Sequence, residues 1–212
     1  MNIATARLRL REMTDEDLPD LRAILHDPEA MTAYNGAFSD AESSAWLRRT
    51  QQRYRDDGFG LWAVVHSGTG RMIGQCGITR QQIDDDEIVE VGYLFQRAHW
   101  GHGYAVEAAA GCRDWAFSTL GIDELYAKIR STNVASMNVA IRLGMTVRRT
   151  FTTHHRGVDM PHLAFAVDRS AWERHADARP IGSRGDVEIG SGRAFLGIRH
   201  FVGTYRRAPG RL

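Results

Sequence analysis

Cysteine and long apolar runs are scarce in this chain of 212 residues. Its two cysteines, Cys76 and Cys112, lie far apart in apolar surroundings, so we expect neither a disulfide framework nor a cysteine zinc site. No segment approaches the roughly eighteen apolar residues that a membrane helix needs, and residues 1–7 lack the apolar core of a signal peptide. We therefore predict a cytoplasmic protein without a membrane anchor or a bound metal ion.

An excess of charge of one sign is also missing, because 27 basic residues stand against 26 acidic ones. Along the chain the balance is uneven. Residues 171–212 hold eight arginines and four acidic residues, so this segment carries about +4 and the preceding body about −3. An acidic body does not favour nucleic acid as the main partner, since phosphate contacts need a basic face. A nucleic-acid-binding or partner-binding arm in the basic segment stays open as an alternative.

Hydrophobic periodicity predicts a mixed α/β fold with about seven strands. We expect strands at 7–11, 61–66, 72–78, 88–95, 125–129, 146–152 and 163–167. Helices are expected over 14–27, from Ser39 to about 58, over about 104–120 and over 133–143. The first of the two halves reads as an antiparallel meander and the second contains a strand–helix–strand unit.

The composition changes after Trp172, where glycines and arginines replace periodic patterns. Too many apolar residues occur there for an ordinary flexible linker. We divide the chain into a domain at 1–175 and a Gly/Arg-rich tail at 176–212. The tail is expected to pack on the body or on a second subunit, so a homodimer is possible.

A Gly-x-Gly-x-Ala segment, from Gly101 to Ala105, follows one predicted strand and opens a helix. Glycines there let the backbone turn tightly, and the first N–H groups of the helix lack partners within it. Such donors at the positive end of a helix suit a diphosphate without any lysine or arginine. A tight turn that binds nothing is the alternative interpretation.

Three ordered segments carry a family resemblance, namely Glu90–Phe95, Trp100–Ala108 and Asn133–Ser136 followed by Leu143–Met145. Together they resemble the GNAT superfamily of N-acetyltransferases, and within it the RimJ/RimL-like branch. The similarity runs from Arg7 to about Trp172. It implies a GNAT-like fold in which the fourth and fifth strands splay apart and helices flank both faces of the sheet.

The resemblance also implies acetyl-CoA as co-substrate and a set of residues around it. The phosphate loop would comprise Trp100, Gly101, His102, Gly103, Tyr104, Ala105 and Val106. Tyr93 and Leu94 would lie beside the thioester, with a main-chain N–H near Leu94 polarising its carbonyl. Asn133 and Asn138 would also lie near the cofactor. From the sequence pattern alone, Asn133 is a helix cap.

Amine acetylation requires a neutral amine and a proton for the departing thiolate. An α-amine has a pKa near 8, so a modest base suffices. Glu90 is our candidate base, with Glu87 as second choice, and a solvated strand-edge carboxylate is the alternative for each. The family often has a tyrosine where this chain has Ala140, so Ser136 becomes the candidate acid, its alternative being an ordinary first-turn hydroxyl.

The remaining polar and aromatic residues are assigned structural roles. We interpret His154, His155 and His162 as surface residues and Cys112 as a packing residue. Tyr34, Trp46 and Trp62 could line an acceptor pocket, although core positions are usual for such side chains.

The sequence thus favours direct acetyl transfer to a primary amine, either a protein N-terminus or a small molecule. A catalytically weak acyl-CoA-binding module with a regulatory role is the alternative, motivated by Ala140. The acceptor, the oligomeric state and the role of the tail do not follow from the sequence.

Overall fold

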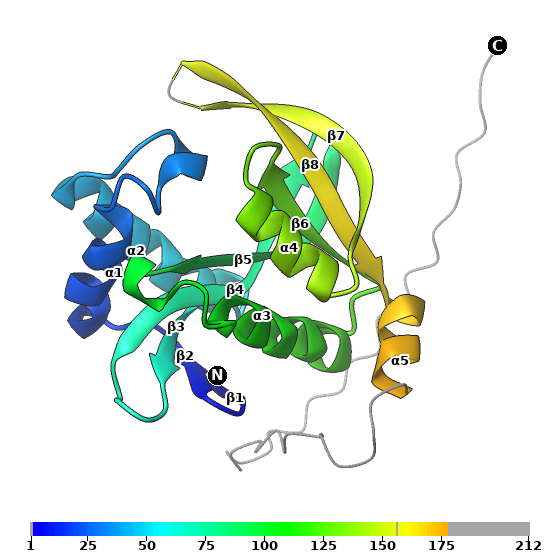
Figure 1. Cartoon of the computed structure of the whole chain (residues 1–212), viewed down its shortest axis with the longest axis horizontal. Helices are drawn as coiled ribbons and strands as arrows, with labels where there is room; N and C mark the ends of the chain where they lie inside the picture. Colours follow the sequence, from blue (N-terminus) through cyan, green and yellow to red (C-terminus); the bar gives the residue numbers. More distant parts are fainter. Residues whose placement is uncertain (1, 156, 178–212) are drawn as a thin grey trace.

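One eight-stranded sheet organises the molecule in the computed structural model, which describes residues 2–155 and 157–177 (Figure 1). The strand order is β1-β2-β3-β4-β5-β6-β8-β7, and every neighbouring pair is antiparallel except β5 and β6. The strands are β1 (Asn2–Ala4), β2 (Leu8–Arg11), β3 (Leu61–His66), β4 (Met72–Ile83), β5 (Asp86–Phe95), β6 (Glu124–Arg130), β7 (Thr146–His155) and β8 (Val158–Asp168). The expected α/β class and flanked sheet are confirmed, with one strand more than the seven predicted.

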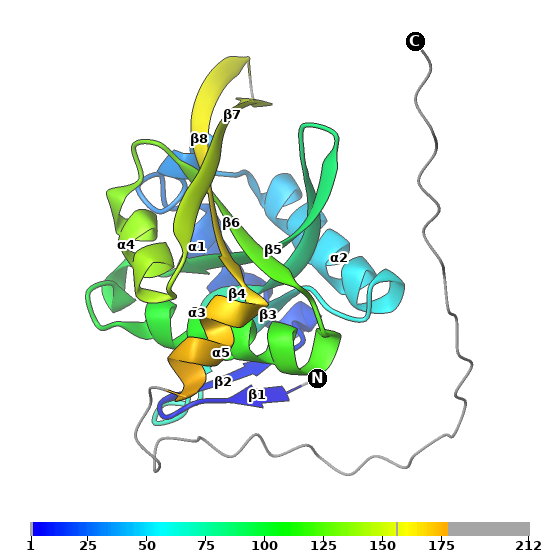
Figure 2. The same cartoon turned by 90° about the vertical axis from the view of Figure 1, so that its right-hand side faces the viewer.

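Helices cover both faces of the sheet, as strand β3 shows (Figures 1 and 2). Trp62 and Val64 pack into one hydrophobic cluster with helix α3, whereas Ala63 and Val65 pack into another with helices α1 and α2. Successive strand residues point to opposite faces, so a continuous apolar run is what a sheet buried on both sides requires. The helices are α1 (Leu18–Leu25), α2 (Asp40–Asp56), α3 (Tyr104–Trp115), α4 (Val134–Arg142) and α5 (Arg169–Asp177), with short helical turns η1 (Asp15–Asp17), η2 (Thr32–Tyr34), η3 (Arg97–His99) and η4 (Ala116–Leu120).

Predicted helix boundaries follow from local caps. Ser39 and Glu42 form the expected reciprocal capping box at the start of α2. Asn133 caps α4 by accepting the backbone N–H of Ser136 at 3.1 Å. Gly121, at a φ of 69°, closes the segment of α3 and η4 in a left-handed conformation that glycine adopts without strain.

The structure extends or adds several elements beyond the predicted bounds. Strand β4 continues to Ile83 and forms a hairpin with β5, so part of the acidic segment 84–87 lies in a strand. Strands β7 and β8 form a longer hairpin than expected, visible as the projecting arm in Figure 2. The additional strand β1 has only three residues, too few for a detectable period.

Helix α5 was not predicted, and it runs to Asp177, across the proposed boundary at 175. Residues 178–212, which make up nearly all of the proposed tail, lie outside the described residues. The tail's packing and its binding role therefore stay predictions.

The two cysteines are also closer than their sequence separation indicated. Their Sγ atoms lie 3.6 Å apart in the core, on β4 and α3, and both are free thiols. Both side chains are fully buried, and burial raises the pKa of Cys112 well above its usual value. The structural role assigned to Cys112 therefore agrees with its position, because a protonated, enclosed thiol is a poor nucleophile.

Candidate active site

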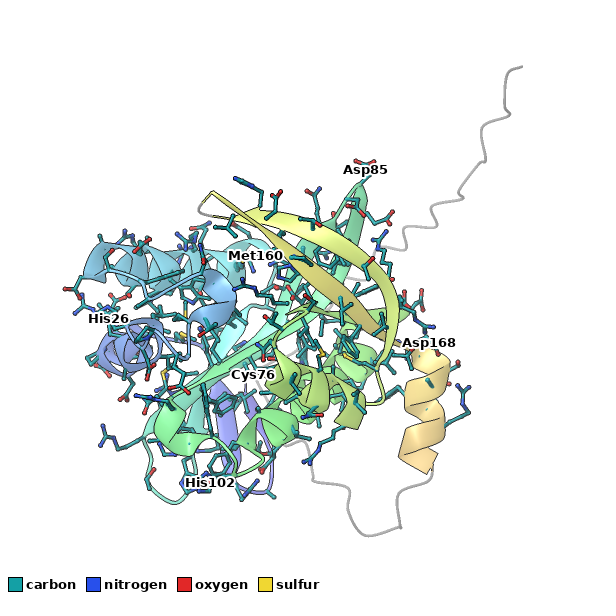
Figure 3. All side chains as sticks on the ribbon, turned by 45° about the horizontal axis from the view of Figure 1, so that its top comes forward. His26, Cys76, Asp85, His102, Met160 and Asp168 are labelled. Atoms are coloured by element: carbon teal, nitrogen blue, oxygen red, sulfur yellow. The ribbon has the colours of Figure 1, made fainter. Side chains whose placement is uncertain are left out.

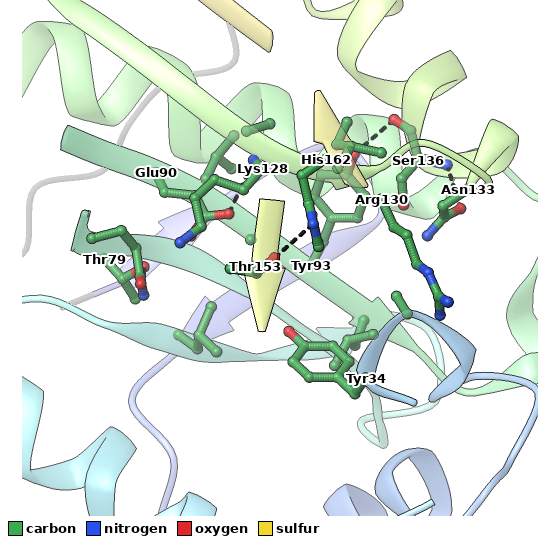
Figure 4. Close-up of a pocket in the computed structure, with 18 of the residues that line it drawn as sticks. Tyr34, Thr79, Glu90, Tyr93, Lys128, Arg130, Asn133, Ser136, Thr153 and His162 are labelled. Carbon is green, nitrogen blue, oxygen red and sulfur yellow. Dashed lines mark hydrogen bonds between the residues drawn. The ribbon is translucent and has the colours of Figure 1, made fainter. Parts of the chain in front are cut away.

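A cavity of about 480 Å³ lies where β5 and β6 separate (Figure 4). These two parallel strands pair at a single position, Glu90 with Tyr126. Beyond it both strands continue, and residues 90–94 of β5 and 127–130 of β6 line opposite sides of the cavity. Because the strands diverge in this direction, the edge of β5 has no partner in β6 there. An extended ligand can therefore pair with that edge.

The first turn of α3 carries unpartnered backbone donors. The earliest backbone bond of this helix runs from the N–H of Glu107 to the carbonyl of Gly103, and no side chain caps the helix. Within the described chain, the N–H groups of Tyr104, Ala105 and Val106 therefore have no protein acceptor. This arrangement fits a phosphate group, since the helix dipole adds to the donors.

The loop before α3 is shaped by two glycines and by contacts of its aromatic residues. Gly101 and Gly103 have φ angles of 78° and 79°, which an L-residue rarely adopts. The Trp100 indole donates to the carbonyl of Phe95 at 2.9 Å. His102 stacks on the Tyr104 ring, and Figure 3 shows it at the edge of the molecule. The loop is exposed and lies outside the cavity lining, as expected for a site that binds the polar end of a long ligand.

Helix α3 is tied to the N-terminal strands through Glu107. Its carboxylate accepts from the Thr5 hydroxyl, the Arg7 backbone N–H and the Arg7 guanidinium, each at 2.7 Å. These bonds outweigh partial burial and lower the pKa of Glu107. The same Arg7 guanidinium lies 4.5 Å from the centre of the Tyr104 ring. The first turn of α3 is thereby held in place.

Glu90 lines the cavity at the point where the strands part. Its Oε1 atom accepts the backbone N–H of Lys128 at 3.1 Å. Burial raises the pKa of Glu90, while the positive charges of Lys128 and Arg53 oppose that shift. A carboxylate with a raised pKa is a stronger base than an exposed one.

Tyr93 of β5 meets Asn133 and Ser136 at the start of α4, and all three line the cavity (Figure 4). The Tyr93 hydroxyl donates to the backbone carbonyl of Ser136 at 2.9 Å, and burial raises the pKa of this phenol. The Asn133 carboxamide oxygen is occupied as the α4 cap. Ala140, the position where the family often has a tyrosine, is fully buried.

Comparisons with known proteins give the family to which a chain with this cavity and helix start belongs. The family model described as "Acetyltransferase (GNAT) domain" matches residues 7–146. The chain belongs to the GNAT acetyltransferase family. It is accordingly an acetyl-CoA-dependent N-acetyltransferase, and the bared amides of α3 together with the open edge of β5 fit that co-substrate.

Individual relatives of this GNAT enzyme extend the comparison. The protein YkkB of Bacillus subtilis is 39% identical over 149 residues, covering 70% of this chain and 87% of its own. The FsC-acetyl coenzyme A-N(2)-transacetylase of Aspergillus fumigatus is 26% identical over 185 residues, covering 80% and 77%. An acetyltransferase structure from Agrobacterium tumefaciens is 28% identical with a TM-score of 0.68, covering 80% and 95%.

The structure of RimL, a ribosomal alpha-N-protein acetyltransferase in complex with coenzyme A, shares the fold with a TM-score of 0.67. The identity is 16%, and the match covers 81% of this chain and 99% of that one. At this identity, the likeness shows a shared fold.

The GNAT fold gathers only some of the predicted site residues in the cavity. Glu90, Tyr93, Leu94, Asn133 and Ser136 line it. The exposed Asn138 and the loop from Trp100 to Val106 do not. Glu87, the second-choice base, is exposed at the β4–β5 hairpin, where it pairs with Arg80 at 3.0 Å.

One interpretation made from the sequence is corrected, and one that was left open is decided. His162 is half-buried in the cavity lining, where burial and the charges of Lys128 and Arg130 lower its pKa, so it is not a surface residue. Tyr34 and Trp46 line the cavity as well, whereas Trp62 is a fully buried core residue. Burial, followed by the Glu90 charge, raises the pKa of Tyr34.

Other lining residues come from elements that the sequence pattern does not connect. They are Arg49, Thr50 and Arg53 of α2, Lys128 and Arg130 of β6, and Thr153 of β7. No local signal distinguishes them from ordinary surface residues, since their role arises only from the packing of α2 and the β7–β8 hairpin around the gap.

Among residues 2–155 and 157–177, no three His, Cys, Asp or Glu side chains are grouped closely enough to hold a metal ion. No helix in the described ranges has both the length and the apolar character needed to cross a membrane.

Proposed function

We propose that this enzyme transfers the acetyl group directly from acetyl-CoA to a primary amine, with Glu90 as the base. The observation that carries the proposal is the position of Glu90, which lines the cavity at the vertex of the diverging strands. The acceptor is either a protein N-terminal α-amine or a small-molecule amine. The names of the relatives include one acceptor of each kind, an N(2) position and an alpha-N-protein.

The proposed co-substrate site extends from the α3 first turn to the cavity. The N–H groups of Tyr104, Ala105 and Val106 would bind the diphosphate, with Gly101 and Gly103 shaping the loop. Trp100 and His102 would flank it, and Asn138 would lie near the outer part of the cofactor. Tyr93, Leu94 and Asn133 would line the pantetheine arm and the thioester.

Bound acetyl-CoA supplies the electrophilic thioester carbonyl. Glu90, directly or through a water molecule, accepts the proton of the amine as its nitrogen bonds to the carbonyl carbon. The carbon–sulfur bond breaks, Ser136 donates its hydroxyl proton to the departing thiolate, and the proton taken up by Glu90 returns to the serine oxygen through solvent. No cysteine is found in the described cavity lining, which supports direct transfer without a covalent acyl-enzyme.

Glu90 is the favoured base because the amine must lose a proton inside a cationic cavity. A nearby positive charge disfavours the ammonium form, and the raised pKa of Glu90 keeps the carboxylate basic. Both effects increase the fraction of the bound amine that is neutral. Since a thiol has a pKa near 8.5, its departure needs only modest help from Ser136.

The experiment is acetyl-CoA-dependent release of free thiol, measured with a panel of amines and N-terminal peptides. We expect turnover with at least one acceptor, and its loss in Glu90→Gln. A protein that is stabilised thermally by CoA but acetylates nothing would support the acyl-CoA-binding module instead. The buried Ala140, which leaves no phenol at the family's usual position, is the observation that favours this second function.

A further inference from the structure

Four cationic side chains line the cavity. Arg49 and Arg53 come from α2, one turn apart, and Lys128 and Arg130 come from β6. In the described lining, Glu90 is the sole carboxylate. The cavity lining therefore has an excess of positive charge, although the whole chain is nearly neutral.

None of these four cations has an ion-pair partner among the described residues. Lys128 and Arg130 donate instead to the backbone carbonyls of Gln82 and Thr32, at 3.2 and 2.8 Å. Arg49 lies 5.9 Å from the centre of the Trp46 ring. Because these contacts are with neutral groups, they do not neutralise the positive charges of the side chains.

Arginines elsewhere in the described chain show the contrast. Arg11 pairs with Asp17 at 2.6 Å, Arg97 with Glu29 at 2.6 Å and Arg149 with Asp86 at 2.8 Å. Clustering cations that have no ion-pair partner costs free energy through their mutual repulsion. An anion that enters with the substrate would recover that cost.

The phosphates of CoA do not account for the two arginines of α2. Helix α2 packs with α1 in the hydrophobic cluster on one face of the sheet, while α3 belongs to the cluster on the other face. The bared amides of α3 lie outside the cavity lining that contains Arg49 and Arg53. The two anion-attracting regions therefore serve different groups.

Arg53 is also close to the groups that would face the reacting amine. Its charge acts on both Glu90 and Tyr34, each of which lines the cavity. Arg130 enters from the opposite side, where it bridges β6 to Thr32 in η2 (Figure 4). An acceptor between these two arginines would lie beside Glu90.

We propose that the acceptor amine also carries a carboxylate or phosphate group, which Arg53 and Arg130 bind, with Arg49 assisting at the rim. This inference rests on the proposed acetyltransferase function and names its substrate class. A cavity of about 480 Å³ suits an amino-acid-sized molecule or the first residues of a peptide. Guanidinium groups match the planar geometry of carboxylate and phosphate oxygens.

The test compares acceptors that differ only in charge. The pairs are alanine with alaninamide, phosphoethanolamine with ethanolamine, and a Ser-Asp-Asp peptide amide with its Ser-Asn-Asn counterpart. We expect kcat/KM to be at least about tenfold higher for the charged member of one pair. The pair that responds distinguishes an amino acid, a phosphate-bearing amine and an acidic N-terminus as the source of the anion.

Substitutions of the arginines test which side chains produce the preference for the charged acceptor. Arg53→Gln and Arg130→Gln should each reduce the charged-to-neutral ratio severalfold, and Arg53→Lys should retain part of it. Arg55→Gln is the matched control, because Arg55 is exposed on the same helix and contacts Gln52. Its ratio should equal that of the parent protein.

Failure of this inference is distinguishable from failure of the proposed function. Equal kcat/KM for charged and neutral acceptors would overturn the anionic substrate class and leave acetyl transfer intact. If no amine were acetylated, the function would fail, and calorimetry on the CoA-loaded protein would still test the inference. Ser-Asp-Asp amide should then bind more tightly than Ser-Asn-Asn amide, and equal or absent binding of both would overturn it.

Discussion

Glu90 of β5 and Lys128 of β6 are joined across the separating strands by a 3.1 Å bond from the Lys128 N–H to the Glu90 carboxylate. This bond lies next to the single Glu90–Tyr126 strand pair, and both of its residues line the cavity. The backbone of one wall thus fixes the proposed base of the other. A side chain held in this way has a defined position for proton transfer.

Replacing Glu90 should remove the rise in activity with pH that accompanies ionisation of its carboxyl group. Because burial raises the pKa of Glu90 above its ordinary 4.5, activity should increase with pH as this group ionises. In Glu90→Gln we expect kcat to fall by about 10²-fold or more, with the remaining activity following ionisation of the amine alone. Glu87→Gln is the control, since Glu87 is exposed and paired with Arg80. Loss of activity in Glu87→Gln but not in Glu90→Gln would reverse the assignment.

The same substitution should increase stability at neutral pH. A folded-state pKa above the unfolded value favours the protonated group, so its stabilising contribution exists below the unfolded pKa and is lost as pH rises through the folded one. At pH 7 the ionised carboxylate therefore opposes folding. We expect Glu90→Gln to raise Tm by about 1–4 °C at pH 7 and to change it little at pH 4. A lower Tm at pH 7, measured by calorimetry, would contradict this account.

Adding a methyl group to Gly103 should weaken binding of CoA. The left-handed backbone costs an L-residue about 1–2 kcal/mol, and any relaxation would redirect the amides of the α3 first turn. We expect Gly103→Ala to raise the CoA Kd about tenfold or more in titration calorimetry. Gly121→Ala is the matched control, with a φ of 69° and no neighbour within 4 Å of the added atom. Gly121→Ala should lose about as much stability as Gly103→Ala but bind CoA as tightly as the parent protein. If the two variants bound CoA with equal affinity, the first turn of α3 would not be the diphosphate site.

The residue that protonates the thiolate can be assigned by comparing variants of Ser136 and Tyr93, which contact each other in the cavity lining. If Ser136 protonates the thiolate, Ser136→Ala should lower kcat about tenfold and leave the KM for acetyl-CoA nearly unchanged. Tyr93→Phe should reduce kcat less, because the Tyr93 hydroxyl already donates to the Ser136 carbonyl. The opposite order in steady-state kinetics would assign the proton to Tyr93.

Local sequence patterns were sufficient for most secondary structure and for the tight turn before α3. Caps such as Ser39 with Glu42 act within a few residues, so their effect can be predicted without knowing the fold. The conformation of Gly103 and the free donors of α3 likewise depend on one short segment. The short β1 was missed because three residues are too few to show a period.

By itself, the sequence determined the α/β class, the helix starts and the family, because hydrophobic period, capping and glycine geometry act between near neighbours in the chain. Only the tertiary structure decided what surrounds Glu90. Arg53, Arg130, Tyr34 and His162 come from α2, β6, η2 and β8, and they meet because those elements pack around the gap between β5 and β6. Charge and burial at such a meeting point depend on long-range packing, which no local pattern encodes.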